Sequence, residues 1–294
     1  MSIGAELWQF VLSGLVVGGI FALIAVGFAL TYQVSGLINF AQGEFAMIGA
    51  LTASSLYAGG SGWPVPAAAV AGVVAAALVG AVAYLLAFRP SRGYNIVTLI
   101  FISLGLDIAL RGAALYIWGT NPYQLAPFLN GNAVMIAGGS IPPQAVWVFA
   151  SDIVLVAVLY TFFARTYLGS AVRAATINPS IASTFGIPLK AFAFWSFVAA
   201  AVVGGIGGVM IAPISTATYD MGLSLGLNGF VAAVVGGLDS LPGAFCGGLL
   251  LGVAEKLCGG LLSTGWEQGI AFVLLIFVLV VRPQGLFARR VRRA

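Results

Sequence analysis

Long apolar runs are the feature that most constrains the fold of this chain. Runs of Ala, Val, Leu, Ile, Phe and Gly recur along its 294 residues, and most approach the roughly 20 residues that a helix needs to cross a bilayer core. Only 7% of the residues are charged, against roughly a quarter in soluble domains. The sequence therefore predicts an all-α polytopic integral membrane protein, with residues 1–294 forming a single transmembrane domain.

We expect about eight to nine crossings, two of them in broken segments. The polar run Asn39–Glu44 interrupts the second expected span, and Asp239–Gly243 separates the seventh from the eighth. If one broken segment is re-entrant, the number of crossings changes. The expected spans are 7–32, 36–57, 64–88, 95–118, 145–164, 191–211, 222–238, 241–253 and 266–281.

The two broken segments raise the hypothesis of an inverted internal repeat. In transporters built from such repeats, interrupted segments in corresponding positions mark a pathway near the bilayer midplane. A shift of 200 residues aligns Val34, Gly36, Gly43 and Phe45 with Val234, Gly236, Gly243 and Phe245. Four such matches in a glycine-rich sequence can also arise by chance.

The basic residues predict the orientation of the chain. Short loops rich in Lys and Arg stay in the cytoplasm. We therefore expect a cytoplasmic C-terminus, a cytoplasmic segment 165–190, an N-terminus outside and an outer loop 119–144. This orientation accounts for the net charge of +4, so no nucleic-acid partner is expected, and the basic tail suits anionic membrane lipid. Ten of the twelve basic residues fall in three groups: Arg89 and Arg92; Arg165, Arg173 and Lys190; and Arg282, Arg289, Arg290, Arg292 and Arg293.

Ionisable residues inside apolar spans are candidates for function. Such groups are expensive in lipid and usually face a bundle interior, a cavity or a partner. Glu44, with Asn39, Gln42 and Gly43, either lines or gates a transport route or caps broken helix ends; both interpretations stay open. Asp239, before Ser240, is interpreted first as a helix-end cap and second as part of the same route.

Other charged residues receive structural interpretations. Asp107 and Arg111 are spaced i, i+4 on one helix, so they are expected to neutralise each other as a structural pair, with a gating role as the alternative. Glu255, Lys256 and Glu267 are expected near the outer face, first as a solvated rim and second as a contact for a docking partner.

The sequence also excludes several classes of function. It contains no His and no G-x-x-x-x-G-K-[ST] phosphate loop, and no nucleophile–base pair is visible. We therefore expect a non-catalytic chain with no metal site and no cofactor of its own.

The segment Tyr167–Lys190 is the one long interior stretch too polar for lipid. A nearly all-apolar protein that keeps such a segment is expected to use it to contact something soluble. Within it, Asn178 can cap a short helix with Pro179 in its first turn, and Gly186 can end that helix.

Together, these motifs resemble the permease subunits of branched-chain amino-acid ABC importers. The resemblance implies a bacterial inner-membrane protein paired with a second, related permease, most simply as a heterodimer. Two cytoplasmic ATPases, which bind the ATP and Mg, and a periplasmic substrate-binding protein complete the importer; loop 119–144 is then periplasmic. The stretches that carry the resemblance are Gly36–Glu44, Phe88–Pro90 with Ser103–Gly105, Leu168–Ile187, Val235–Gly248 and Arg282–Phe287.

The same resemblance assigns residues to the coupling of ATP hydrolysis and transport. In such permeases a cytoplasmic loop seats a short helix, here Asn178–Gly186, in a groove of the ATPase. The family often has His where this chain has Gln42, so urea, short amides or other small carboxylates are alternative substrates. A rival of another class is an ion-coupled secondary transporter, with Glu44 and Asp239 as coupling ligands. The coupling residues implied by the resemblance are Gly169, Arg173, Ala174, Asn178, Pro179, Ala182, Gly186 and Ile187.

Overall fold

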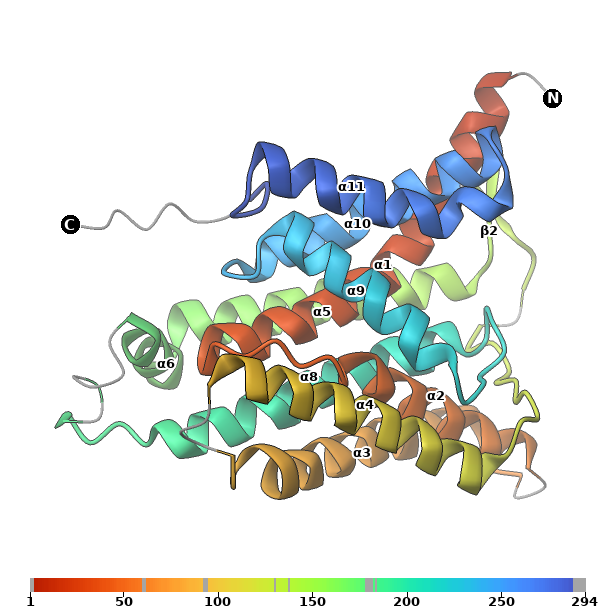
Figure 1. Cartoon of the computed structure of the whole chain (residues 1–294). Helices are drawn as coiled ribbons and strands as arrows, with labels where there is room; N and C mark the ends of the chain where they lie inside the picture. Colours follow the sequence, from red (N-terminus) through yellow and green to blue (C-terminus); the bar gives the residue numbers. More distant parts are fainter. Residues whose placement is uncertain are drawn as a thin grey trace.

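The computed structural model of the chain describes residues 3–59, 62–91, 95–129, 131–136, 138–177, 182 and 184–287. These residues form a bundle of helices with one small hairpin (Figure 1). The expectation of an all-α polytopic membrane protein is confirmed, because six of the described helices are long and apolar enough to cross a membrane. They are α1 (Ile3–Ser35), α3 (Val65–Ala83) with the π-helical turn η1 (Tyr84–Phe88), α4 (Ile96–Trp118), α5 (Gln144–Arg165), α8 (Leu189–Ile211) and α10 (Leu241–Leu261).

Shorter elements complete the bundle. The hairpin of β1 (Val134–Ile136) and β2 (Gly139–Ile141) is antiparallel, with Met135 opposite Ser140. Gln9 of α1 holds this hairpin through two hydrogen bonds of 2.8 Å to the backbone of Ser140. The remaining helices are α2 (Gln42–Ala58), α6 (Tyr167–Ile177), α9 (Met221–Gly236), α11 (Glu267–Val281) and the 3-10 turn η2 (Thr264–Trp266).

The bundle has two distinct ends. One carries α6 and the C-terminal end of α11, and we call it the α6 end; the other carries β1, β2 and the start of α1, and we call it the hairpin end (Figure 1). The first helix thus starts at the end opposite to the one where the last helix stops.

Helix α1 lies at the centre of the bundle and packs against α10 along a glycine-lined contact. A methyl group at Gly14 would lie 2.6 Å from Cα of Val253, and one at Gly18 would lie 2.9 Å from Cα of Leu249. Small residues let helix backbones approach in this way within a membrane. The largest fully buried side chains of the same core include Phe28, Ile20 and Ile24 of α1, so α1 forms the axis around which the other helices pack.

Helix α10 is longer than the sequence predicts. The expected span stops at residue 253, whereas α10 continues to Leu261. The charged pair Glu255–Lys256 suggests a helix end, but Glu255 is buried in the bundle and the Lys256 ammonium binds the Glu267 carboxylate of α11 at 3.1 Å. Neither residue therefore ends the helix.

The two broken segments follow helices that run in the same direction. Gln33, near the C-terminal end of α1, donates a 3.3 Å hydrogen bond to the carbonyl of Leu238, just after α9. Because the C-terminal ends of both helices meet at the α6 end, the 200-residue shift relates segments of equal direction rather than inverted copies.

Candidate functional site

The first break carries the chain into the middle of the bundle. After α1 ends at Ser35, Gly36 turns the backbone with a φ of 69°. The connection then runs from the α6 end into the interior before α2 begins at Gln42 (Figure 1). Asn39 closes the turn, because its Oδ1 accepts a 3.2 Å hydrogen bond from the Ala41 amide. The polar run therefore leads into a buried helix start instead of interrupting a continuous helix.

Gln42 links this helix start to two other helices. Its side chain is fully buried, and its Nε2 donates a 2.8 Å hydrogen bond to the Ala200 carbonyl of α8. The amide group lies against Gly27 of α1 and Gly204 of α8, and a methyl group at Gly27 would collide with it. Gly27 and Gly204 form the two walls of a slot for the Gln42 amide, and a side chain at either position would narrow this slot.

Glu44 belongs to a cluster of three charged residues. It is 0% exposed, and its Oε1 lies 3.5 Å from Nη2 of Arg111 in α4. The same Nη2 lies 2.6 Å from Oδ2 of Asp107. The expected Asp107–Arg111 pair is therefore present, and Glu44 joins it from another helix, which no local pattern indicates. The cluster places two carboxyl groups around a single guanidinium.

The second break lies at the α6 end. Ser240 caps α10, because its Oγ accepts a 3.1 Å hydrogen bond from the Gly243 amide, with Pro242 in the first turn. Asp239 is exposed and contributes no cap. The cap expected at Asp239 is thus found one residue later, because Ser240 is the residue that precedes the first helical turn.

The structure does not bring the acids of the two breaks, Glu44 and Asp239, together. Glu44 packs against Gly222, near the first residue of α9, whereas Asp239 follows the end of that helix. A helix of 16 residues is about 24 Å long at 1.5 Å per residue. The two acids therefore lie near opposite ends of α9 and cannot share one ligand.

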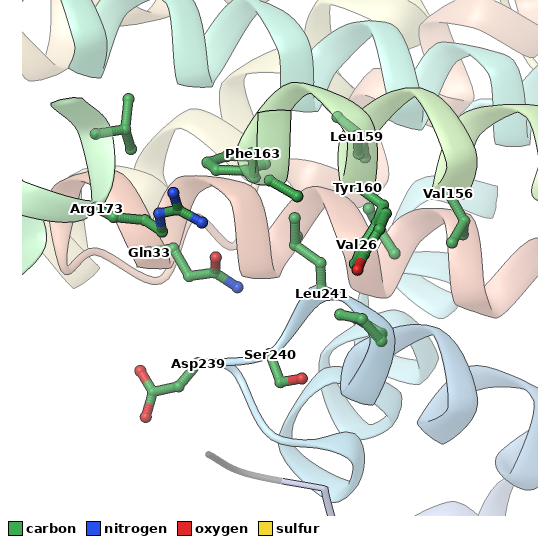
Figure 2. Close-up of a pocket in the computed structure, with 13 residues that line it drawn as sticks. Val26, Gln33, Val156, Leu159, Tyr160, Phe163, Arg173, Asp239, Ser240 and Leu241 are labelled. Carbon is green, nitrogen blue, oxygen red and sulfur yellow. The ribbon is translucent and has the colours of Figure 1, made fainter. Parts of the chain in front are cut away.

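A pocket of about 370 Å³ lies beside the second break. Helices α1, α5 and α6 and the α9–α10 loop form its walls (Figure 2). Its polar residues include Gln33, Tyr160, Arg173, Asp239 and Ser240, and its other lining residues are apolar.

The polar segment 165–190 begins with α6, which packs on the end of α5. Thr166 caps α6 by accepting a 3.0 Å hydrogen bond from the Gly169 amide. A side chain at Gly169 would collide with the backbone of Phe162 and Phe163, so a packing requirement explains this glycine. Arg173 and Ala174 are exposed on α6.

The end of this segment contains a glycine helix cap. Gly186 has a φ of 77°, and the Ile187 amide donates a 3.1 Å hydrogen bond to the carbonyl of the buried Ala182. This six-to-one bond is that of a Schellman motif, which ends a helix, as expected for Gly186. Asn178 and Pro179 lie outside the described residues.

Asp152 is a candidate that the sequence reasoning missed. It lies in the middle of α5, is 1% exposed and packs against Gly19 of α1. Neither carboxyl oxygen has a hydrogen-bond partner among the described residues. The signal was available, because Asp152 is a single acid within an apolar span, the same criterion that selected Glu44.

Glu255 does not lie on the solvated outer rim where the sequence predicts it. It is buried on α10, and its Oε2 has no partner in the described part of the chain. The expected solvated position is therefore wrong for Glu255, because its face of α10 points into the bundle. Lys256 and Glu267 are only half-buried and form an ion pair.

Comparisons with known proteins identify similar chains along nearly the full length. Residues 10–279 match the family model described as "Branched-chain amino acid transport system / permease component". The chain is 31% identical to the high-affinity branched-chain amino acid transport system permease protein LivH of Escherichia coli, covering 96% of this chain and 95% of LivH. It is 32% identical to the corresponding permease BraD of Pseudomonas aeruginosa, with the same coverage.

Among solved structures, the fold is similar to a chain of PsaBC from Streptococcus pneumoniae in complex with Fab. The TM-score is 0.50 with 11% sequence identity, over 94% of this chain and 93% of the other. At this identity the similarity concerns the fold alone.

Proposed function

The chain belongs to the family of permease components of branched-chain amino acid transport systems, and on this premise we propose that it is the permease subunit of an ABC importer for branched-chain or related small amino acids. It pairs with a second, related permease in the bacterial inner membrane. A periplasmic binding protein delivers the substrate, and two cytoplasmic ATPases drive the transport.

The observation that carries this proposal is the length of the match to named permeases. The chain aligns over 96% of its residues with LivH and BraD and spans 95% of each of them. A match over nearly the full length supports the role of the entire subunit and not only of one motif.

We place the α6 end in the cytoplasm. Four basic residues lie at or next to the ends of helices that reach this end, and a fifth, Arg173, lies within α6; the four are Arg89, Arg165, Lys190 and Arg282. Their common location supports the assignment, because Lys and Arg are retained on the cytoplasmic side. The hairpin of β1 and β2 then faces the periplasm and the binding protein.

We assign ATPase binding to α6 and the turn at Gly186. Arg173 and Ala174 are exposed there, and three large apolar side chains lie near them in sequence with little cover: Tyr167, Leu168 and Phe185, the last 82% exposed. Aromatic side chains and Arg are the residue types that most often anchor protein interfaces. An ATPase groove would cover them.

The buried acids bear on the transport mechanism through the helices that they connect. Glu44, Arg111 and Asp107 hold α2 against α4, so a movement of α2 during alternating access must keep or replace these ion pairs. The rival, an ion-coupled transporter, needs Glu44 and Asp239 in one pathway. Their positions near opposite ends of α9 favour the ATP-driven function.

Uptake by reconstituted vesicles tests the proposal. The chain, its sister permease, the ATPases and the binding protein are reconstituted, and uptake of radiolabelled L-leucine is measured with and without ATP. We expect uptake that needs both ATP and the binding protein. Uptake of urea or acetamide in place of leucine would contradict the substrate class, and gradient-driven uptake by this chain alone would contradict the importer.

A charge reversal tests the coupling assignment. We expect Arg173→Glu to lower leucine uptake by about tenfold or more, since a like charge at an interface disfavours the partner, while the vesicles still hydrolyse ATP. Arg89→Glu, an exposed residue at the end of η1, is the matched control. Unchanged uptake in Arg173→Glu would show that the ATPases bind elsewhere.

A further inference from the structure

The pocket at the α6 end combines opposite charges with an apolar wall. Arg173 comes from α6 and Asp239 from the α9–α10 loop, whereas Val26, Leu159 and Leu241 contribute aliphatic side chains. Figure 2 shows Arg173, Gln33 and Asp239 toward one side of the pocket, and Val26, Val156 and Leu159 toward the other. The two charged side chains therefore lie toward one side of the pocket, and these aliphatic side chains lie toward the other.

Neither charged group is used by the fold. Arg173 and Asp239 are exposed, and among the described residues the three ion pairs are formed by other side chains. A guanidinium binds a carboxylate through two parallel hydrogen bonds, and a carboxylate binds an ammonium group by charge and hydrogen bonding. Both line the pocket, so a ligand that carries one group of each sign can pair with them there while the rest of α6 contacts the ATPases.

The pocket has the size of a site for a small metabolite. Its 370 Å³ lies near the lower limit of the roughly 300–1,000 Å³ that ligand sites span, and such sites combine apolar walls with a few polar groups that fix orientation. A zwitterion with an aliphatic side chain matches this distribution: its carboxylate pairs with Arg173, its ammonium with Asp239, and its side chain with the aliphatic wall.

We propose that this pocket binds a free aliphatic amino acid from the solution at the α6 end. The assignment rests on the proposed function, which places this end in the cytoplasm and supplies the ligand as the transported product. A bound amino acid bridges α6, assigned to the ATPases, and the loop between α9 and α10.

The binding test uses the complete permease–ATPase complex in nanodiscs without the binding protein. Radiolabelled L-leucine is the probe, with two competitors that each lack one charge: isocaproate, which has only the carboxylate, and isoamylamine, which has only the ammonium. We expect saturable leucine binding. Each competitor should bind about tenfold or more weakly than leucine, because each lacks one charge-assisted hydrogen bond.

Two conservative variants separate recognition from folding. Asp239→Asn is expected to lower the affinity for leucine by about tenfold and to leave the affinity for isocaproate unchanged. Arg173→Gln is expected to lower the affinity for leucine by a similar factor and to leave the affinity for isoamylamine unchanged. The matched controls are Asp220→Asn, an exposed acid just before α9, and Arg89→Gln; neither control is expected to change any of the three affinities.

Each outcome decides the proposal. Absence of saturable leucine binding, in a complex whose vesicles take up leucine, would overturn the pocket and leave the importer standing. If each variant lowered the affinities for all three ligands equally, Arg173 and Asp239 would have only a structural role. Competition by isocaproate and isoamylamine as strong as that by unlabelled leucine would show that neither charge is recognised, and would indicate an apolar occupant such as a lipid acyl chain. Leucine binding in vesicles that fail to import it would overturn the importer instead.

Discussion

The two broken segments have the same pattern in the sequence and opposite surroundings in the structure. At the first, Gln42 and Glu44 are fully buried and bind residues of α8 and α4. At the second, Ser240 binds only its own helix, and Asp239 is exposed. A helix, a polar break and another helix can therefore form either a contact between several helices or a simple turn.

The length of the break accounts for the difference. Six residues, 36–41, separate α1 from α2, whereas four, 237–240, separate α9 from α10. At about 3.3–3.6 Å per extended residue, the first linker reaches roughly 20 Å, enough to pass the middle of a hydrocarbon core about 30 Å thick. The second reaches roughly 13 Å and leaves the chain at the bundle end. The longer linker therefore carries the start of α2, with Gln42 and Glu44, into the bundle.

Removing the cation of the first break should have the largest effect. Arg111→Met leaves Glu44 and Asp107 without their guanidinium, and breaking a buried ion pair lowers the free energy of unfolding by about 3–5 kcal/mol. Thermal unfolding of the purified subunit in detergent measures the loss. Arg165→Met, at the exposed end of α5, is the control, and an equal melting temperature in both variants would show that the cluster does not hold α4.

The slot for Gln42 should give an intermediate effect. A methyl group in Gly27→Ala collides with the Gln42 amide, and overpacking of this kind destabilises by about 1–3 kcal/mol. Adding Gln42→Ala should recover most of the loss. Gly207→Ala is the matched control, because its methyl group meets Leu23 at an ordinary 3.4 Å. Failure of the second substitution to rescue the first would contradict the slot.

The cap at the second break should matter less. Ser240→Ala removes the hydrogen bond to the Gly243 amide, and loss of such a cap lowers the free energy of unfolding by about 1 kcal/mol. Ser224→Ala, whose hydroxyl is exposed and bonds only to Met221 in its own helix, is the comparison in the same unfolding assay. A loss as large as that of Arg111→Met would remove the distinction between the breaks.

Asp239→Asn should have the smallest effect on stability. The side chain is exposed and forms no ion pair among the described residues, so we expect the free energy of unfolding to change by less than about 0.5 kcal/mol. Denaturant titration of the same subunit provides the measurement. A larger loss would mean that Asp239 supports the fold in a way similar to Glu44.

Much of the fold could be predicted because apolar run length and loop chemistry are local properties. The bounds of α4 and α5, the Asp107–Arg111 pair and the glycine cap at Gly186 all follow from residues close together in the sequence. Asp152 could also have been found, by the rule applied to Glu44.

Contacts between distant helices could not be predicted. Glu44 and Arg111 are 67 positions apart, and nothing in either segment indicates that α2 and α4 bring them together. The pocket is a similar case, because it joins Gln33, Arg173 and Asp239 from three separate regions. The length of α10 was underestimated for the same reason: the burial of Glu255 depends on its neighbours in space.

The glycine-lined contact of α1 with α10 has a consequence for biosynthesis. The surface around Gly18 is complete when α1 leaves the ribosome, but its partner around Gly252 follows roughly 230 residues later. At about 5–20 residues per second, the wait lasts roughly 10 to 50 seconds. During that interval α1, the central helix of the bundle, must remain in the membrane before α10 has been synthesised. A truncated nascent chain that ends before residue 241 should therefore keep α1 open to neighbours that the finished protein excludes.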